Sequence, residues 1–137
     1  MFSFFKKRKK ELLIFIVEDN EIYLRQLTFF LEKKFGKKIT IKTFKVAEIA
    51  LLELDTKPDL IIMDHFLNSK YEDASNGYTM LDEIHKKHPE IKLILHTSQS
   101  DVDLAIEAIR SGICKYVSKN KEGFEHIAEI ITAMYER

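Results

Sequence analysis

Apolar runs that look like buried strands alternate with helical patterns along this chain. The strand-like runs cover residues 12–17, 38–44, 59–64, 91–97 and 115–119. The segments with apolar residues near helical spacing are 21–35, 46–54, 78–88, 100–112 and 123–137. Such alternation is typical of a parallel sheet with right-handed crossovers and helices on both faces. Only the run 38–44 alternates with period two, which predicts one more solvated face.

The length of the chain suits a single domain of this kind. It has 137 residues, of which 45% are hydrophobic and 32% charged, as in ordinary globular proteins. No internal repeat, low-complexity tract or interdomain linker is visible. We therefore expect one domain over residues 11–137, preceded by a basic tail over residues 1–10.

The tail combines aromatic and basic residues, Phe2, Phe4 and Phe5 standing before the unbroken basic run 6–10. This order is wrong for a signal peptide. The simplest interpretation is a solvated tail, and the alternative is weak contact with an anionic membrane. Over the whole chain 22 Lys and Arg balance 22 Asp and Glu, which does not favour a nucleic-acid partner. Cys114 is the single cysteine, so no internal disulfide can form, and we expect a reducing, cytoplasmic location.

Polar side chains stand at the carboxyl ends of four of the five predicted strands. They are Glu18 and Asp19 after the first strand, Asp64 at the third, Thr97 and Ser98 at the fourth, and Ser118 and Lys119 at the fifth. Parallel strands bring these ends to one edge of the sheet, which is where open α/β sheets bind ligands.

The residue types at this edge suit phosphoryl chemistry. Converging carboxylates repel one another, and a hard cation such as Mg²⁺, which prefers oxygen ligands, relieves that repulsion. Lys119 adds a mobile positive charge, and Thr97 or Ser98 adds a hydroxyl donor. Together these groups can stabilise a phosphoryl group, and an aspartate can accept it as an acyl phosphate.

Four motifs resemble those of the receiver domains of two-component response regulators. FIVEDN resembles the first strand and acidic pair of that family, DLIIMD the strand with the phosphoacceptor aspartate, LILHTS the Thr/Ser position, and YVSKN the lysine motif. The resemblance extends from about Leu12 to Arg137. It implies a flavodoxin-like, doubly wound sheet in the strand order 2-1-3-4-5, with helices on both faces.

The resemblance implies a metal site and a phosphoacceptor. Matched by position, Asp64 is the residue that would accept the phosphoryl group. Glu18 and Asp19 would bind Mg²⁺ directly or through water, together with Asp64 and the backbone carbonyl of Phe66.

The resemblance also implies a switch. Thr97 would donate its hydroxyl to the phosphoryl group, and Lys119 would pair with that group. Tyr116 matches the aromatic position that changes rotamer on activation. Thr97 and Tyr116 would then alter the partner preference of the face made by the fourth helix, fifth strand and fifth helix.

Three departures from the family pattern lie near the site. Asn120 replaces the usual proline after the lysine, and Asn68 stands where a proline is common. The loop between Asp64 and Gly77 is longer than usual. None of these changes removes a catalytic group, so we expect an active site.

The resemblance implies a sensor histidine kinase or a histidine phosphotransfer protein as phosphoryl donor. Because these 137 residues hold no output domain, we expect a stand-alone receiver that signals to a downstream protein target and binds no nucleic acid. It would catalyse only its own phosphorylation and dephosphorylation, with no separate substrate. One alternative is a receiver-like scaffold that is never phosphorylated. Another is a phosphatase of the haloacid dehalogenase type, which would need a second aspartate where Phe66 stands.

Overall fold

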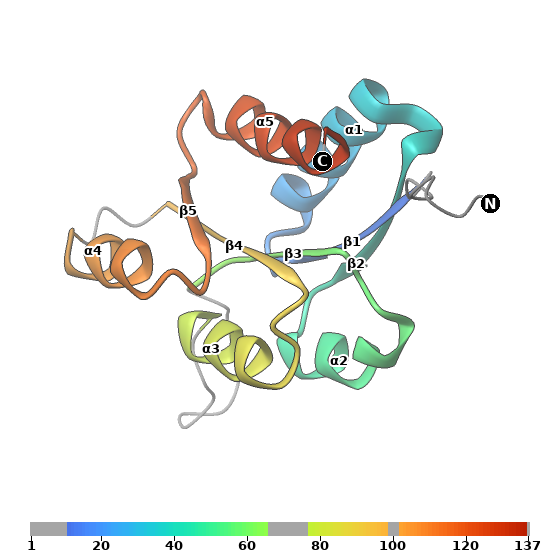
Figure 1. Ribbon diagram of the computed structural model, residues 1–137. Coiled ribbons are helices and arrows are strands. Elements are labelled where there is room, and N and C mark those ends of the chain that lie inside the picture. Colours follow the sequence, from blue (N-terminus) through green and yellow to red (C-terminus); the bar gives the residue numbers. More distant parts are fainter. Residues whose placement is uncertain (1–10, 66–76, 99–101, 137) are drawn as a thin grey trace.

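A five-stranded parallel sheet forms the centre of the computed structural model, which describes residues 11–65, 77–98 and 102–136 (Figure 1). The strand order is β2-β1-β3-β4-β5. The strands are β1 (Leu12–Val17), β2 (Ile39–Phe44), β3 (Leu60–Met63), β4 (Lys92–Thr97) and β5 (Lys115–Ser118). The predicted fold class and strand order are therefore confirmed.

Helices cover both faces of the sheet. They are α1 (Glu21–Phe35), α2 (Ala47–Leu52), α3 (Gly77–Lys87), α4 (Val102–Ser111) and α5 (Gly123–Tyr135), with short 3₁₀ turns at Gly36–Lys38 and Leu54–Thr56. Helices α1 and α5 lie together on one face, and α2 and α3 lie on the other (Figure 1). Helix α4 lies beside β5, and its Ala108 joins the core on the α2–α3 side.

The core has two halves because neighbouring residues of a strand point to opposite faces. In β3, Leu60 and Ile62 pack with α1 and α5, whereas Ile61 and Met63 pack with α2 and α3. All four side chains are at most 1% exposed. This explains why the run looked continuously apolar in the sequence, as expected for a strand covered on both faces.

One residue of the predicted apolar face of α1 lies outside the core. Ile22 is among the apolar residues of the segment 21–35, but it is 71% exposed while Leu24 and Leu27 are buried. Ile22 precedes Leu24 by two residues, which is roughly 200° around the helix and therefore on the opposite side.

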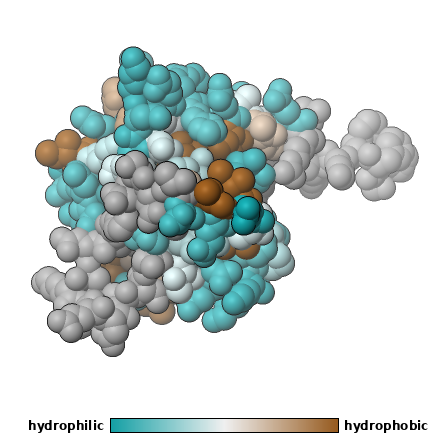
Figure 2. All heavy atoms as spheres, turned by 90° about the vertical axis from the view of Figure 1, so that its left-hand side faces the viewer, coloured by the Kyte–Doolittle hydropathy of each residue, from teal (hydrophilic) through white to brown (hydrophobic). Residues whose placement is uncertain are grey.

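No described helix is both long and apolar enough to cross a membrane. The side of the molecule that carries α4 is largely hydrophilic, with small, separate hydrophobic areas (Figure 2). Ile106 and Ile109 of α4 are 44% and 67% exposed. The predicted basic tail and the segment 66–76, with Phe66 and Asn68, lie outside the described residues.

Candidate functional site

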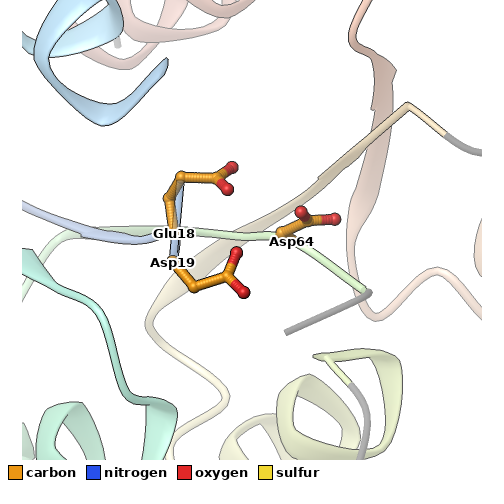
Figure 3. Close-up of side chains that lie close together, drawn as sticks. All are labelled: Glu18, Asp19 and Asp64. Atoms are coloured by element: carbon orange, nitrogen blue, oxygen red, sulfur yellow. The ribbon is translucent and has the colours of Figure 1, made fainter. Parts of the chain in front are cut away.

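Three carboxylates converge at the carboxyl edge of the sheet (Figure 3). Glu18 and Asp19 directly follow β1, and Asp64 directly follows β3. One oxygen from each lies within 4.8 Å of the others, which is close enough to share a metal ion. Glu18 and Asp64 are only 3% and 7% exposed. The structure therefore brings together the three acidic residues that the sequence pattern singled out.

Backbone hydrogen bonds fix where these carboxylates stand. The Glu18 amide donates to the Phe44 carbonyl at 2.9 Å, and the Asp64 amide donates to the Val17 carbonyl at 3.2 Å. Both bonds extend the strand ladders by one residue. The parallel register aligns Val17 with Met63, so the residues that follow them emerge side by side.

Lys119 reaches into the carboxylate cluster from the end of β5. Its Nζ lies 2.5 Å from Oε1 of Glu18 and 3.0 Å from Oδ2 of Asp64. Its backbone amide donates to the Thr97 carbonyl at 3.0 Å, which anchors the base of the side chain to β4. The side chain is 10% exposed, so this contact is largely shielded from water.

Burial and ion pairing shape the charges of this cluster. Burial raises the pKa of Glu18, and the hydrogen bond from Lys119 offsets only part of that rise. Burial also acts to lower the pKa of Lys119, but its hydrogen bonds to Glu18 and Asp64, together with their negative charges, outweigh burial and raise that pKa. Lys119 is therefore charged at neutral pH and acts as an internal counter-cation.

The donor set fits a hard divalent cation. All three candidate ligands are carboxylates, the type of ligand that Mg²⁺ prefers. The three carboxylates outnumber the single ammonium group of this cluster, so a cation at this edge would relieve repulsion among them.

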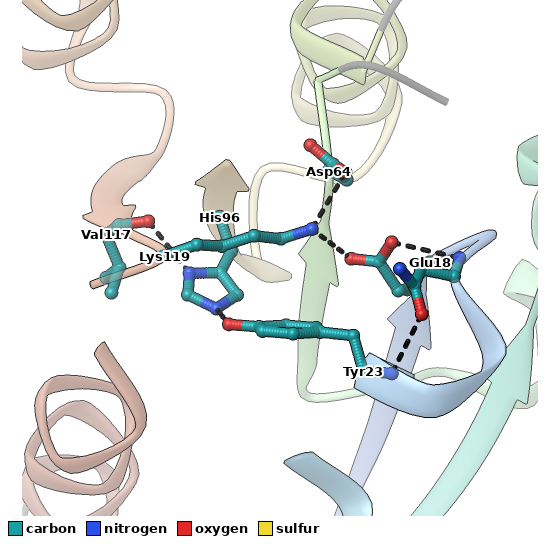
Figure 4. A network of polar contacts seen from close by, with 7 residues as sticks. Glu18, Tyr23, Asp64, His96, Val117 and Lys119 are labelled. Carbon is teal, nitrogen blue, oxygen red and sulfur yellow. Dashed lines mark hydrogen bonds and ion pairs between the residues drawn. The ribbon is translucent and has the colours of Figure 1, made fainter. Parts of the chain in front are cut away.

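A second polar layer lies beneath Lys119 (Figure 4). The Nζ of Lys119 is 4.4 Å from the ring centroid of Tyr23 in α1. The Tyr23 hydroxyl is 2.5 Å from Nε2 of His96, and Nδ1 of His96 is 2.8 Å from the Val117 carbonyl. Because a carbonyl can only accept, Nδ1 carries the proton, and the Tyr23 hydroxyl donates to Nε2.

Sequence reasoning did not assign Tyr23 to the site. Helical periodicity singles out the apolar residues of α1, and Tyr23 lies between two of them in the sequence. The available signal was His96, a polar residue inside an apolar strand, because a buried polar group needs a hydrogen-bond partner. His96 is 2% exposed and finds that partner in Tyr23.

Comparison with known proteins decides the family. A family model described as the response regulator receiver domain matches residues 14–132. The chain belongs to this family of receiver domains.

Related proteins and solved structures agree with this assignment. NtrC, a DNA-binding transcriptional regulator of Salmonella typhimurium, is 26% identical over 124 residues, which are 89% of this chain and 24% of NtrC. The chain thus spans about a quarter of the length of this curated relative. The BeF3-activated DrrB receiver domain is 23% identical, with a TM-score of 0.75 over 93% of this chain and 99% of DrrB. The receiver domain of an HD domain-containing protein from Pseudomonas fluorescens is 25% identical, with a TM-score of 0.75 over 93% and 88% of the two chains.

Of the remaining predicted site residues of this receiver domain, Thr97 lies at the same edge and Tyr116 lies two residues before the end of β5. Thr97 ends β4, is fully buried, and aligns with Ser118 of β5 in the sheet register. Tyr116 of β5 is half-buried and packs against the α2–α3 half of the core. The backbone carbonyl of Phe66, predicted as a metal ligand, lies outside the described residues.

The turn after Lys119 is built without the usual proline. The Asn120 side-chain oxygen accepts from the Glu122 amide at 3.1 Å, and its backbone carbonyl accepts from the Gly123 amide at 3.0 Å. All peptide bonds among the described residues are trans. Asn120 thus supplies the hydrogen bonds that lead the chain from Lys119 into α5.

Proposed function

We propose that this receiver domain accepts a phosphoryl group on Asp64 in a Mg²⁺-dependent reaction. The observation that supports this proposal is the convergence of Glu18, Asp19 and Asp64 with Lys119 at the carboxyl edge of the sheet. An oxygen of Asp64 forms a bond to phosphorus while the bond from phosphorus to the donor's histidine nitrogen breaks. The leaving nitrogen keeps the electron pair and takes up a proton.

Glu18, Asp19 and Asp64 would hold the metal, and the Phe66 carbonyl is proposed as a further ligand. Bound Mg²⁺ neutralises negative charge on the phosphoryl oxygens. Lys119 pairs with the same oxygens, because its ammonium already lies 3.0 Å from Asp64. Thr97 donates its hydroxyl from the adjacent strand end. Each of these hydrogen bonds involves a charged group and is therefore stronger than a neutral one.

We propose that phosphorylation is read out by a protein partner. The new group carries about −1.5 to −2 charge. Thr97 moves towards it, and Tyr116 moves inward into the space that Thr97 leaves. The face made by α4, β5 and α5 then changes its affinity for a downstream protein, and its exposed Ile109 offers apolar contact area. A near-complete switch needs roughly 5.5 kcal/mol of differential binding.

The donor in this proposal is a sensor histidine kinase or a histidine phosphotransfer protein, since receiver domains act with histidine kinases. We expect no separate substrate and no nucleic-acid contact from these residues. Both expectations remain predictions for this chain.

Acetyl phosphate provides a direct test that needs no partner. The protein is incubated with acetyl phosphate and Mg²⁺, and its intact mass is measured. We expect the mass of one added phosphoryl group on the wild type, and none on Asp64→Asn or after EDTA treatment. Asp55→Asn is the matched control, because Asp55 is an exposed aspartate outside the cluster and its loss should leave the added mass in place.

Two results would overturn the proposal. A wild-type protein that gains no mass and binds no Mg²⁺ would instead favour a scaffold that is never phosphorylated. An Asp64→Asn variant that gains the same mass as wild type would place the acceptor elsewhere.

A further inference from the structure

Tyr23 provides an aromatic platform for the lysine of the proposed phosphoryl site. Its ring centroid lies 4.4 Å from Nζ of Lys119 (Figure 4). The other lysine–ring pairs in the described part of the chain are longer, at 5.8 to 5.9 Å. Lys119 is also much less exposed than a surface lysine. A cation–π contact strengthens when the cation is desolvated, so this pair is the strongest of the set.

The Tyr23 ring is held in place from three directions. Its backbone amide donates to the side chain of Asn20 at 3.0 Å, which fixes the first turn of α1. Its hydroxyl donates to Nε2 of His96 at 2.5 Å, and Nδ1 of His96 in turn donates to the Val117 carbonyl of β5. Phe124 of α5 packs edge-on against the ring, with centroids 5.5 Å apart. A ring restrained in this way can orient a flexible partner.

The contacts of Lys119 with the ring and with the carboxylates do not compete. The ring face accepts the ammonium through its quadrupole, while the N–H groups reach Glu18 and Asp64. A lysine side chain has four flexible carbons, and holding one of its conformations costs entropy. A fixed aromatic surface beside the stem and head group reduces the conformations that Lys119 can reach.

We infer that Tyr23, anchored by His96, is a positioning residue that holds the Lys119 ammonium at the phosphoryl-accepting edge of the sheet. This inference rests on the function proposed above. In this role Tyr23 acts through Lys119 and is not itself a metal ligand. Without the ring, Lys119 would spend less time where it can pair with phosphoryl oxygens, and phosphorylation would slow.

Nuclear magnetic resonance of lysine side chains tests the contact without any phosphoryl chemistry. The protein is labelled with ¹³C-lysine, and the Lys119 ε-CH₂ signal is assigned from its loss in Lys119→Arg. Protons above an aromatic face are shifted upfield by its ring current. We expect an upfield Lys119 signal in wild type and in Tyr23→Phe, and a signal near those of exposed lysines in Tyr23→Leu.

The rate of phosphorylation tests the consequence of the contact. With acetyl phosphate and saturating Mg²⁺, Tyr23→Leu should react about tenfold more slowly, which corresponds to about 1.4 kcal/mol. Tyr23→Phe keeps the ring and should stay within about threefold of wild type, the difference reflecting the lost bond to His96. This rescue by phenylalanine distinguishes the ring from the hydroxyl.

Phe30→Leu is the matched control for lost packing. Phe30 lies on the same helix, packs against Phe124 at 5.3 Å, and has Lys34 5.8 Å from its ring. Its replacement removes the same kind of ring but leaves Lys119 untouched. The phosphorylation rate and the Lys119 signal should match wild type.

The outcomes separate this inference from the proposed function. An unshifted Lys119 signal in wild type, or a folded Tyr23→Leu that reacts at the wild-type rate, would overturn the role of Tyr23 while Asp64 still accepts the phosphoryl group. Equal slowing in Tyr23→Leu and Phe30→Leu would reduce Tyr23 to a packing residue. A wild type that accepts no phosphoryl group would overturn both proposals.

Discussion

Gly77 allows two backbones to meet beside Asp64. A Cβ built at Gly77 would overlap the carbonyl oxygen of Asp64 and lie 2.8 Å from Cα of His65. The amide of Gly77 donates to the His65 carbonyl at 3.0 Å, so the first residue of α3 is held against the end of β3. The absence of a side chain at Gly77 thus lets α3 start next to the proposed phosphoacceptor.

Replacing Gly77 with alanine should therefore destabilise the protein and disturb the site. We expect Gly77→Ala to lower the free energy of unfolding by about 1–3 kcal/mol, because the new methyl group forces the backbone apart. Phosphorylation by acetyl phosphate should slow as well, since Asp64 shifts with its carbonyl. Urea unfolding measures the first effect. Glu83→Ala, at an exposed position of the same helix, should stay within about 0.5 kcal/mol of wild type, and an equal loss there would contradict the steric argument.

Helix α1 is tied to the site through its first turn. The Asn20 amide donates to Oε2 of Glu18 at 3.1 Å, and the Asn20 side chain accepts from the Tyr23 amide at 3.0 Å. Asn20 is the N-cap of the helix, so one residue orients a proposed metal ligand and starts the element that carries Tyr23. The start of α1 therefore has both a structural and a functional role.

Loss of this cap should weaken α1. We expect Asn20→Ala to reduce the free energy of unfolding by about 1 kcal/mol, because the Tyr23 amide loses its partner. Asn20→Ser keeps a side-chain oxygen that can accept the bond and should recover most of the loss. Chemical denaturation of both variants measures the difference, and equal stabilities would argue against capping at this position.

At the scale of the whole molecule, the buried His96 of β4 links its own strand to β5 and to α1. His96 contacts Tyr23 from α1 and the Val117 carbonyl in β5, and a Cβ added at Gly123, at the start of α5, would lie 3.2 Å from its ring. Burial lowers the pKa of His96 to about 4, and the hydrogen bond to Val117 offsets part of that shift. Nearby charges act in both directions, since Lys119 and His126 lower the pKa and Asp64 raises it.

The stability of the fold should therefore fall in mild acid. An unfolded histidine protonates near its usual pKa of 6.5, whereas folded His96 stays neutral until about pH 4. The folded state binds fewer protons in this window, so the contribution of His96 is complete above pH 6.5 and is lost as the pH falls towards 4. From pH 7 to pH 5 the loss amounts to about 2 kcal/mol.

A non-titrating variant isolates this effect from that of the carboxylates. The difference in unfolding free energy between pH 7 and pH 5 should be about 2 kcal/mol smaller in His96→Gln than in wild type. Identical profiles for wild type and His96→Gln would refute the prediction.

Much of this architecture could be predicted from the sequence because its signals are local. Apolar runs and helical spacing are read from neighbouring residues, and they gave the five strands, whereas the family resemblance gave the strand order. The apolar residues of the segment 21–35 do not all lie on one face, because helical geometry places Ile22 and Leu24 on opposite sides. The role of Gly77 depends on a contact with the backbone of another element, which no local pattern reveals.

The sequence by itself determined which chemical groups stand at the strand ends, because a parallel sheet delivers the residues after each strand to one edge. Glu18, Asp19 and Asp64 follow from that rule and from the family resemblance. Only the tertiary structure decided which side chains form the second polar layer of the site, next to Lys119. Tyr23 and His96 are 73 positions apart and meet because α1 packs beside α5 on one face of the sheet. Such a contact depends on the relative placement of whole elements, which side-chain packing fixes and local sequence does not encode.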